Sequence, residues 1–397
     1  MARVLNFLIW GVLLIGLTSC SKRQSPDITT IPHPTSPAPI EAPLPPLPME
    51  KQKAMPVPAP TGPLSHKIGV LLPLTGPHEN LGKGMLQAAE MALFETGTTS
   101  VILLPQDTAQ GAHQAALKAL DEGAELLLGP IFAAEVEAVK PLLHARNVNL
   151  ISFSTDQNMA GDRTFILGFL PSQQIERVTR FAKAKGLTKI AAFTPDDPYG
   201  RLIDQTLKKL DSQGDIQLLG IIHYTKGDLL EGNPGNIRLL EEVALYKTKG
   251  LDALVIPEGG ENLAHLMVLL KPQLPLKILG SGQWDTPETL QQAQTGLEGA
   301  LFASTTPQER QNFQARFEKA YGSTPPRIAT LAFDATALAA SLADRGYSIE
   351  NLTFLEGFSG TDGLFRLTPQ GLNERGLAVL EVTSSGFKPL SPAPQSF

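Results

Sequence analysis

The sequence predicts an α/β protein of two similar lobes with a cleft between them. From Lys67 onward, short apolar runs alternate with helical patterns, which is typical of βα units around a parallel sheet. A second series of the same kind follows Phe169. Ligands of open α/β sheets bind at the carboxyl ends of the strands. The expected site is therefore a cleft between the two lobes.

The first series contains four apolar runs separated by amphipathic segments. The strands expected here are Ile68–Leu74, Ser100–Leu104, Leu126–Leu128 and Asn149–Phe153. In the segments between them, apolar residues recur at spacings of three and four, which indicates helices. The helices expected are Gly84–Phe94, Ala112–Glu122 and Ala134–His144. Together these elements predict the first lobe.

The second series repeats the pattern after Phe169. The helices expected are Gln173–Lys185, Gly200–Gln213, Ile237–Thr248 and Glu261–Leu270. The strands expected are Lys189–Phe193, Ile216–Tyr224, Ala253–Ile256 and Lys277–Leu279. Asp196 and Asp197 resemble a catalytic carboxylate pair, but Asp197 precedes Pro198 at a helix start. This position favours an N-cap.

The segment after Gly299 complicates a simple division into two lobes. It reads as a strand at Ala300–Ser304, two helices at Gln308–Tyr321 and Arg327–Arg345, and a final β-hairpin built from Gly357–Arg366 and Leu377–Thr383. Residues 390–397 read as a loose tail.

The N-terminus has the pattern of an export signal over residues 1–20. Arg3 gives a positive start, and the apolar run Val4–Leu17 is too short to span a bilayer as a mature helix. The ending Leu17-Thr-Ser-Cys20 resembles the lipobox of bacterial lipoproteins, which implies cleavage before Cys20 and acylation of that residue. Ser21, the residue after Cys20, resembles the pattern of lipoproteins that are sorted to the outer membrane. A plain secretory signal or an uncleaved anchor, with Cys20 incidental, is the alternative.

Residues 21–64 read as a tether between the signal and the folded region. Positions 25–63 hold 13 of the 33 prolines, and proline removes amide donors and favours an extended spacer. A recognition segment for a proline-binding groove is the alternative. Cys20 is the only cysteine, so the folded region has no internal disulfide. The net charge of -6 without basic clusters argues against nucleic acid as a partner.

Six motifs in order resemble the type 1 periplasmic binding proteins of the leucine-binding kind. They are Ile68–Pro77, Leu81–Gly84, Leu128–Ile131, Asn149–Ser152, Asp197–Gly200 and Phe358–Gly363. The resemblance implies one domain over residues 65–389, made of two Rossmann-like lobes that the chain joins by three crossings near Phe169, Ala300 and Ser348. Lobe I would then be residues 65–169 and 301–348, and lobe II residues 170–300 and 349–389.

The ligand cleft is expected to be lined by residues that follow the strands. These are Thr75, Phe132, Ala133, Ser154, Thr155, Tyr199, Glu258, Gln283 and Trp284. The match to amino-acid receptors is partial, since Phe132 and Ala133 offer amides but no hydroxyl, and Asp156 would repel a carboxylate. Gln283 stands near the position of an expected acidic partner. Trp284 either stacks on a ligand or packs in the core.

These departures favour a regulatory role over transport. Three features resemble penicillin-binding protein activators: the sequence of the first strand, the lipobox and the Gly129-Pro130 dipeptide. These activators are outer-membrane lipoproteins that stimulate a peptidoglycan synthase, and the resemblance is to their C-terminal domain. The resemblance implies a lipid-anchored protein of the cell envelope, facing the periplasm, whose partner is such a synthase. The helical-repeat domain of the known activator is missing here. The alternative is a solute-binding lipoprotein that delivers an amino acid or a related small molecule to an ABC transporter.

No motif of an enzyme is present. The segment Gly76–Gly84 has five residues between its first two glycines, where a phosphate loop has four, and it lacks the Ser or Thr that holds magnesium. The histidines are scattered without metal-ligand spacing. Neither a nucleophile elbow nor a Ser-x-x-Lys motif occurs. We therefore expect no catalytic residue, no cofactor and no metal.

Overall fold

The computed structural model describes residues 65–230, 232–292 and 296–397. The predicted signal peptide, the lipidation of Cys20 and the tether over residues 21–64 lie outside the described residues. Within this part of the chain, no helix is both long and apolar enough to cross a membrane.

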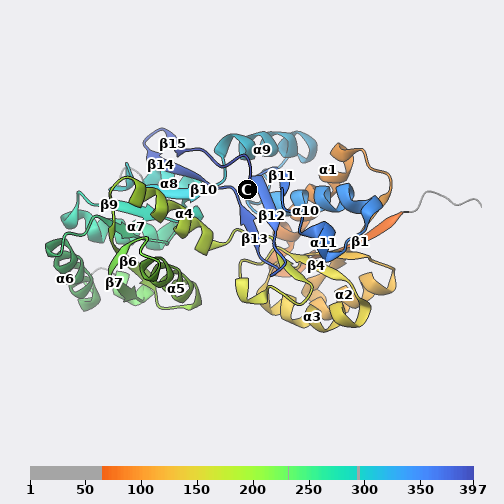
Figure 1. Cartoon of the computed structure of the whole chain (residues 1–397), viewed down its shortest axis with the longest axis horizontal. Coiled ribbons are helices and arrows are strands. Elements are labelled where there is room, and N and C mark those ends of the chain that lie inside the picture. Colours follow the sequence, from red (N-terminus) through yellow and green to blue (C-terminus); the bar gives the residue numbers. More distant parts are fainter. Residues whose placement is uncertain (1–64, 231, 293–295) are drawn as a thin grey trace, which may run out of the picture. The chain divides into compact units, whose positions relative to one another are not determined.

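Lobe I is built on a five-stranded parallel sheet (Figure 1). Its strand order is β2-β1-β3-β4-β5. The strands are β1 (His66–Leu72), β2 (Val101–Asp107), β3 (Leu126–Leu128), β4 (Asn149–Ser152) and β5 (Thr164–Ile166). The helices are α1 (Glu79–Thr96), α2 (Ala112–Asp121), α3 (Ala133–Arg146), α9 (Pro307–Tyr321), α10 (Ala329–Leu342) and α11 (Ile349–Leu352). Apolar side chains of β1 alternate between a core under α1 and α10 and a second core under α2 and α3. Helices therefore cover both faces of the sheet, as expected for parallel strands.

Lobe II is built on a seven-stranded sheet with the order β15-β14-β10-β9-β8-β6-β7. The strands are β6 (Lys189–Pro195), β7 (Gln217–Tyr224), β8 (Ala253–Val255), β9 (Lys277–Gly280), β10 (Leu301–Ser304), β14 (Ala378–Thr383) and β15 (Gly386–Ser391). The helices are α4 (Pro171–Ala184), α5 (Pro198–Ser212), α6 (Pro234–Thr248), α7 (Gly260–Leu270) and α8 (Pro287–Gln292). Strands β6 to β10 pair in parallel, whereas β14 pairs antiparallel with β10 and β15. The second βα series thus forms a second α/β lobe.

In each lobe a glycine lets one helix, α1 or α5, lie close to the end of the strand before it. A Cβ on Gly82 of α1 would lie 2.0 Å from the carbonyl oxygen of Pro73, and one on Gly200 of α5 would lie 1.9 Å from that of Pro195. Asp197 caps α5, since its Oδ1 accepts a hydrogen bond from the Gly200 amide at 2.9 Å. The N-cap prediction for Asp197 is confirmed.

The chain crosses between the lobes after β5, after β10 and after the short strand β13 (Asn373–Arg375). The third crossing was predicted near Ser348, with residues 349–389 in lobe II. That prediction is wrong for residues 349–375, because Leu352, Phe365 and Leu367 are buried in the lobe I core. Only β14 and β15 return to the lobe II sheet.

The predicted pairing of the C-terminal hairpin is also wrong. β12 (Gly363–Leu367) pairs with β11 (Phe358–Gly360) and β13 in a separate three-stranded sheet, and β14 pairs elsewhere. The tail predicted to be loose over residues 390–397 is largely exposed but is held at two points. β15 extends to Ser391, whose Oγ accepts a hydrogen bond from Arg177, and the Arg366 guanidinium lies 4.5 Å from the centre of the Phe397 ring.

Candidate functional site: a pocket between the lobes

A pocket of about 270 Å³ lies between the lobes, and we call it the interlobe pocket. It is lined by Thr155, Phe169, Pro171, Gln174, Tyr199, Gly282, Gln283, Ser304, Thr305, Arg327 and Leu377. Thr155 follows β4, Tyr199 follows β6 and Gln283 follows β9. The pocket therefore lies at the carboxyl ends of parallel strands, where α/β sheets bind ligands. Phe169, Thr305 and Leu377 come from the three crossings between the lobes.

Tyr199 uses its hydroxyl for hydrogen bonds within its own lobe. The hydroxyl donates to the carbonyl oxygen of Pro257 at 2.9 Å, and it lies 3.2 Å from the Ser281 hydroxyl. Burial raises the pKa of Tyr199 to about 12, so the phenol stays neutral. The residue thus offers the interlobe pocket the face and edge of a neutral ring.

Gln174 supports the floor of the interlobe pocket. Its Oε1 accepts from the Gly282 amide at 2.9 Å, which ties α4 to the turn after β9. A Cβ on Gly282 would lie 2.5 Å from the Gln174 amide nitrogen. A larger residue at this position would therefore displace the Gln174 side chain that makes the hydrogen bond.

Arg327 lines the interlobe pocket and also belongs to a row of buried charges. We call this row the interlobe charge chain, and its members are Arg310, Asp285, Arg327, Asp362, Arg375 and Asp334. Positive and negative groups alternate along it, three of each sign. Only Asp285 comes from lobe II. The ion pairs that Asp285 makes therefore join the two lobes.

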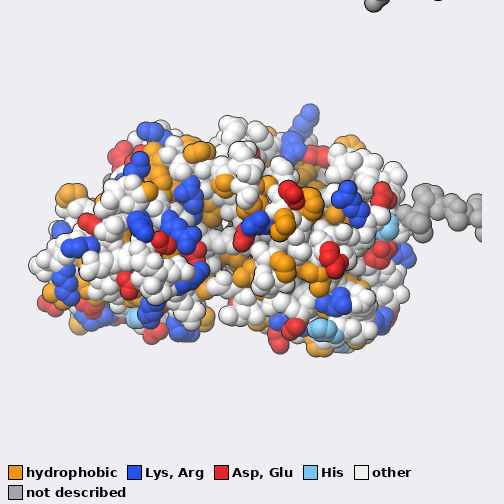
Figure 2. All heavy atoms as spheres, viewed as in Figure 1, with side chains coloured by type: hydrophobic (Ala, Val, Ile, Leu, Met, Phe, Trp, Pro, Cys, Tyr) orange, Lys and Arg blue, Asp and Glu red, His pale blue; other side chains and the backbone are white. Residues whose placement is uncertain are grey.

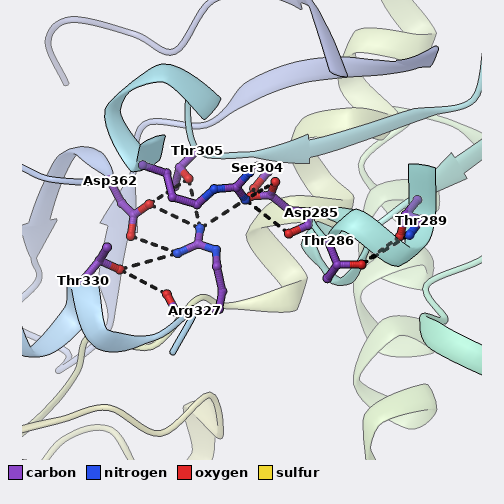
Figure 3. Close-up of polar contacts among 9 residues, drawn as sticks. Asp285, Thr286, Thr289, Ser304, Thr305, Arg327, Thr330 and Asp362 are labelled. Carbon is purple, nitrogen blue, oxygen red and sulfur yellow. Dashed lines mark hydrogen bonds and ion pairs between the residues drawn. The ribbon is translucent and has the colours of Figure 1, made fainter. Parts of the chain in front are cut away.

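Arg327 lies between two carboxylates in this row (Figure 3). Its Nη1 donates to Asp362 at 3.2 Å, and its Nη2 lies 3.6 Å from the nearer oxygen of Asp285. Nη2 also donates to the Thr305 hydroxyl at 3.1 Å, and that hydroxyl donates to Asp362 at 2.9 Å. Asp285 accepts from the Ser304 hydroxyl at 2.9 Å. Two residues of the second crossing thus bind the carboxylates on either side of Arg327.

The two carboxylates at the lobe I end of the interlobe charge chain, Asp362 and Asp334, have pKa values shifted in opposite directions. Burial alone would raise the pKa of Asp362, but the guanidinium groups of Arg327 and Arg375 hold it below its ordinary value. Burial raises the pKa of Asp334 to about 6, and Arg375 offsets only part of this effect. Arg375 Nη1 lies 3.9 Å from Asp334, too far for a hydrogen bond. Arg375 and Asp334 thus attract each other by charge without a hydrogen bond between them, while Asp334 Oδ1 accepts from the Thr361 amide at 2.6 Å.

The Phe169 ring, which lines the interlobe pocket, contacts two guanidinium groups. The Arg327 guanidinium lies 4.5 Å from the centre of its ring, and that of Arg375 lies 5.0 Å away. Both are cation–π contacts. The residue that begins the first crossing is thus held in place by the charge chain.

Three of the residues predicted for the cleft line the interlobe pocket, namely Thr155, Tyr199 and Gln283. The others lie elsewhere at the strand ends. Thr75 is exposed and donates to Asp107 at 2.6 Å, and the buried Ser154 hydroxyl accepts from the Asp156 amide.

Phe132 and Ala133 stand at the start of α3, outside the lining of the interlobe pocket. The Phe132 ring lies 4.9 Å from the ring of His78. Glu258 accepts from the hydroxyl of Tyr224 and does not line the pocket either. Of the cleft residues predicted in lobe I, only Thr155 therefore lines the interlobe pocket.

Trp284 belongs to the core of lobe II, so its prediction as a cleft residue is wrong. Its side chain is fully buried, and its Nε1 donates to the Glu258 carbonyl oxygen at 2.7 Å. The ring packs on Gly280, where a Cβ would lie 2.2 Å from the indole. A short turn over Gly282–Trp284 folds the indole back under its own strand.

Asp156 does not face a ligand as a free carboxylate. Its Oδ1 accepts from the amide and the side chain of Asn158, both at 3.0 Å, so the group holds a local turn. The described residues contain no group of three or more His, Cys, Asp or Glu side chains that could hold a metal ion.

The sequence analysis missed Arg327, Asp285 and Asp362. Asp362 lies inside the quoted Phe358–Gly363 motif, and Asp285 directly follows Trp284. The only local signal was that these charged residues adjoin predicted strand ends or turns. Their pairing depends on the crossings, which bring distant segments together.

Comparison with known proteins gives a consistent result. Residues 65–375 match the family model described as periplasmic binding protein. A solved structure of a putative branched-chain amino acid ABC transporter from Rhodospirillum rubrum is similar with a TM-score of 0.72 and 18% identity, covering 82% of this chain and 100% of that one.

Two further solved structures are similar. A leucine binding protein from Thermotoga maritima has a TM-score of 0.59 and 20% identity, covering 82% of this chain and 98% of its own. A solute binding protein of an ABC transporter from R. palustris, in complex with benzoate, has a TM-score of 0.58 and 18% identity, covering 84% and 97%. At these identities, the likeness concerns the fold.

Among curated proteins, an uncharacterized protein from Rickettsia prowazekii is 22% identical over 148 residues. The match spans 36% of this chain and 39% of that protein.

Proposed function

Because this chain belongs to the periplasmic binding protein family, we propose that it holds a small polar ligand in the interlobe pocket and delivers it to an ABC transporter. The family and the similar structures are non-enzymatic ligand-binding proteins, so the chain is not an enzyme. The family also places it in the cell envelope. The observation that carries the proposal is the interlobe pocket itself, which draws on strand ends of both lobes and on all three crossings.

The lining of the interlobe pocket indicates the kind of ligand. A volume of about 270 Å³ is at the small end for ligand sites. Thr155 and Gln283 offer a hydroxyl and an amide, while Phe169, Tyr199 and Leu377 offer apolar surface. The one charged residue of the lining, Arg327, already has two carboxylate partners. A neutral or zwitterionic molecule with a short apolar part fits this lining best.

A ligand screen tests the proposal directly. We would measure the melting temperature of the full chain with standard amino acids and with benzoate. A ligand at about 100 times its Kd stabilises the native state by about 2.7 kcal/mol. The variant Gln283→Ala should then weaken binding, whereas Gln213→Ala, an exposed glutamine at the end of α5 outside the pocket, should not. Equal binding by both variants would exclude the interlobe pocket as the site.

The anchoring of the chain is part of the proposal. Cys20 would carry the lipid, and Ser21 after it is typical of lipoproteins sorted to the outer membrane. Mass spectrometry of the N-terminal peptide from membrane fractions would detect the acyl groups on Cys20. A Cys20→Ser variant that still fractionates with membranes would contradict lipid anchoring.

A second candidate is an activator of a penicillin-binding peptidoglycan synthase. It is favoured by the internal use of hydroxyls that a receptor would give to a ligand, since Thr75 is bonded to Asp107 and Ser154 to the Asp156 amide. The ion pairs of Asp285 also suit a protein that presents a fixed surface. Adding the full chain to a purified synthase and measuring glycan polymerisation tests this role. An unchanged rate would reject it.

A further inference from the structure

A second hollow, about 680 Å³ in volume, lies beside the first and third crossings. We call it the lateral hollow. It shares only Leu377 with the interlobe pocket. Residues 169, 171 and 174 line the interlobe pocket, whereas residues 170, 172 and 173 line the lateral hollow. The first crossing and the start of α4 thus separate two distinct sites.

Two helix faces form the lobe II wall of the lateral hollow. On α4 the lining residues are Ser172, Gln173, Glu176, Arg177 and Arg180, and on α5 they are Leu202, Gln205, Thr206 and Lys209. Both sets follow the spacing of one helix face. Lys and Arg side chains gather over α4 and α5 on the face shown in Figure 2. The wall carries three cations and one carboxylate, in a chain whose net charge is -6.

Arg177 differs from its neighbours because it has no carboxylate partner among the described residues. Arg180 pairs with Asp215 at 3.1 Å, and Lys209 pairs with Glu176 at 2.8 Å. Arg177 instead donates from Nε to the Leu377 carbonyl oxygen at 2.9 Å and from Nη2 to the Ser391 hydroxyl at 2.6 Å. Its Nη1 has no acceptor in the part of the chain that the structure describes.

The surroundings of Arg177 favour an added anion. The side chain is half-buried, and desolvation lowers the pKa of its guanidinium. A cation that has lost part of its hydration without gaining a counter-ion is unfavourable, and a bound anion would offset that cost. The two free hydrogens of Nη1 can donate to carboxylate or phosphate oxygens.

We propose that the lateral hollow is a second binding site, which takes the carboxylate or phosphate group of a polar ligand. Arg177 binds the anion, and Arg180 and Lys209 add positive potential at the rim. The lobe I wall contributes the Thr368 hydroxyl and the exposed Gln370 amide for the rest of the ligand.

The two acidic residues that line the lateral hollow do not cancel this preference. Glu374 is held by Arg366, and Glu176 is held by Lys209. Arg375 also lines the hollow, but its guanidinium nitrogens are buried and face the charge chain. Among the lining residues, Arg177 is therefore the half-buried cation whose guanidinium has no carboxylate partner in the described part of the chain.

Anion titrations of the full chain test the proposal. We would follow binding of inorganic phosphate and of citrate by calorimetry at low ionic strength, with sodium chloride at matched ionic strength as reference. Arg177→Gln should weaken binding of the recognised anion by about tenfold, as expected for loss of a charge-assisted hydrogen bond. A response to phosphate alone would indicate a phosphorylated ligand, and a response to citrate alone a carboxylated one.

A second variant separates binding from folding, because Arg177 also holds Leu377 and Ser391. The double variant Arg180→Gln, Lys209→Gln changes exposed side chains only and should also weaken binding of the anion. Lys208 is the neighbour of Lys209 on α5 and lies outside the lining, so Lys208→Gln should bind the anion with the affinity of the wild-type protein. Absence of binding of both anions, or equal weakening in the Lys208 variant, would overturn the proposal. Gln283→Ala reports on the interlobe pocket alone, so the two sites fail independently.

Discussion

Replacing Asp285 by Asn should destabilise the fold by about 3 kcal/mol. Asp285 is 4% exposed and, among the residues that the structure describes, is the only carboxylate paired with Arg310. Removing one partner of a buried ion pair costs about 3 to 5 kcal/mol, because the other charge stays buried. The lower end applies here, since the side chains of Arg310 and Arg327 are 20% and 30% exposed and Arg327 keeps Asp362.

Urea unfolding of the full chain measures this loss as a lower midpoint. Glu79→Gln provides the control, because the Glu79–Lys83 pair is exposed and should contribute at most about 1 kcal/mol. A second variant tests the cause. Adding Arg310→Met to Asp285→Asn should recover part of the loss, since apolar groups often replace a buried ion pair at little cost. A loss no larger than that of Glu79→Gln would refute the view that the charge chain stabilises the contact between the lobes.

Three other variants test separate parts of the structure. Asp334 has a folded-state pKa of about 6, above its unfolded value, so the folded state gains stability from this group as pH falls from 7 to 5. Asp334→Asn should reduce this gain, measured as the rise in melting temperature over the same pH range. An unchanged pH profile of the melting temperature would contradict the raised pKa of Asp334. Gly82→Ala should lower the free energy of unfolding by at least about 1 kcal/mol, measured by urea unfolding, since its Cβ would lie 2.0 Å from the Pro73 carbonyl oxygen. Trp284→Ala should cost about 3 to 5 kcal/mol as a core truncation, and a loss of ligand binding without loss of stability would return Trp284 to the cleft.

The elements that the sequence predicts well are those fixed by local patterns. The strand Leu126–Leu128 lies where its apolar run predicts it, and the helix after Asp197 begins at the predicted cap. Each depends on residues close in sequence: buried β-sheet runs in one case, and a carboxylate three residues before an amide in the other. The two lobes follow from repetition of these local units.

The errors arise where the outcome depends on contacts between distant segments. The run Leu377–Thr383 has the pattern of a hairpin partner, but its strand β14 pairs with β10 and buries its side chains in the two cores of lobe II. The sequence places Trp284 just after a strand, where its ring could either stack on a ligand or pack in the core. In the structure the ring packs inward against Gly280, which has no side chain to block it. Sequence spacing carries no information on such choices.

The charge chain was the hardest feature to foresee and bears most on function. Arg327 and Asp285 are both unremarkable in sequence, yet Arg327 contributes to the interlobe pocket and to the ion pairs with lobe II. A ligand that contacts Arg327, Ser304 or Thr305 therefore acts on residues that also set how the lobes meet. If the ligand binds one arrangement of these side chains more tightly than another, the equilibrium between the corresponding arrangements of the lobes shifts by that difference in binding free energy. On the proposed receptor function, Asp285→Asn should thus change ligand affinity as well as stability, although Asp285 does not line the interlobe pocket. A variant that loses stability but binds the ligand with unchanged affinity would show that pocket and charge chain are independent, and would favour a fixed scaffold of the activator kind.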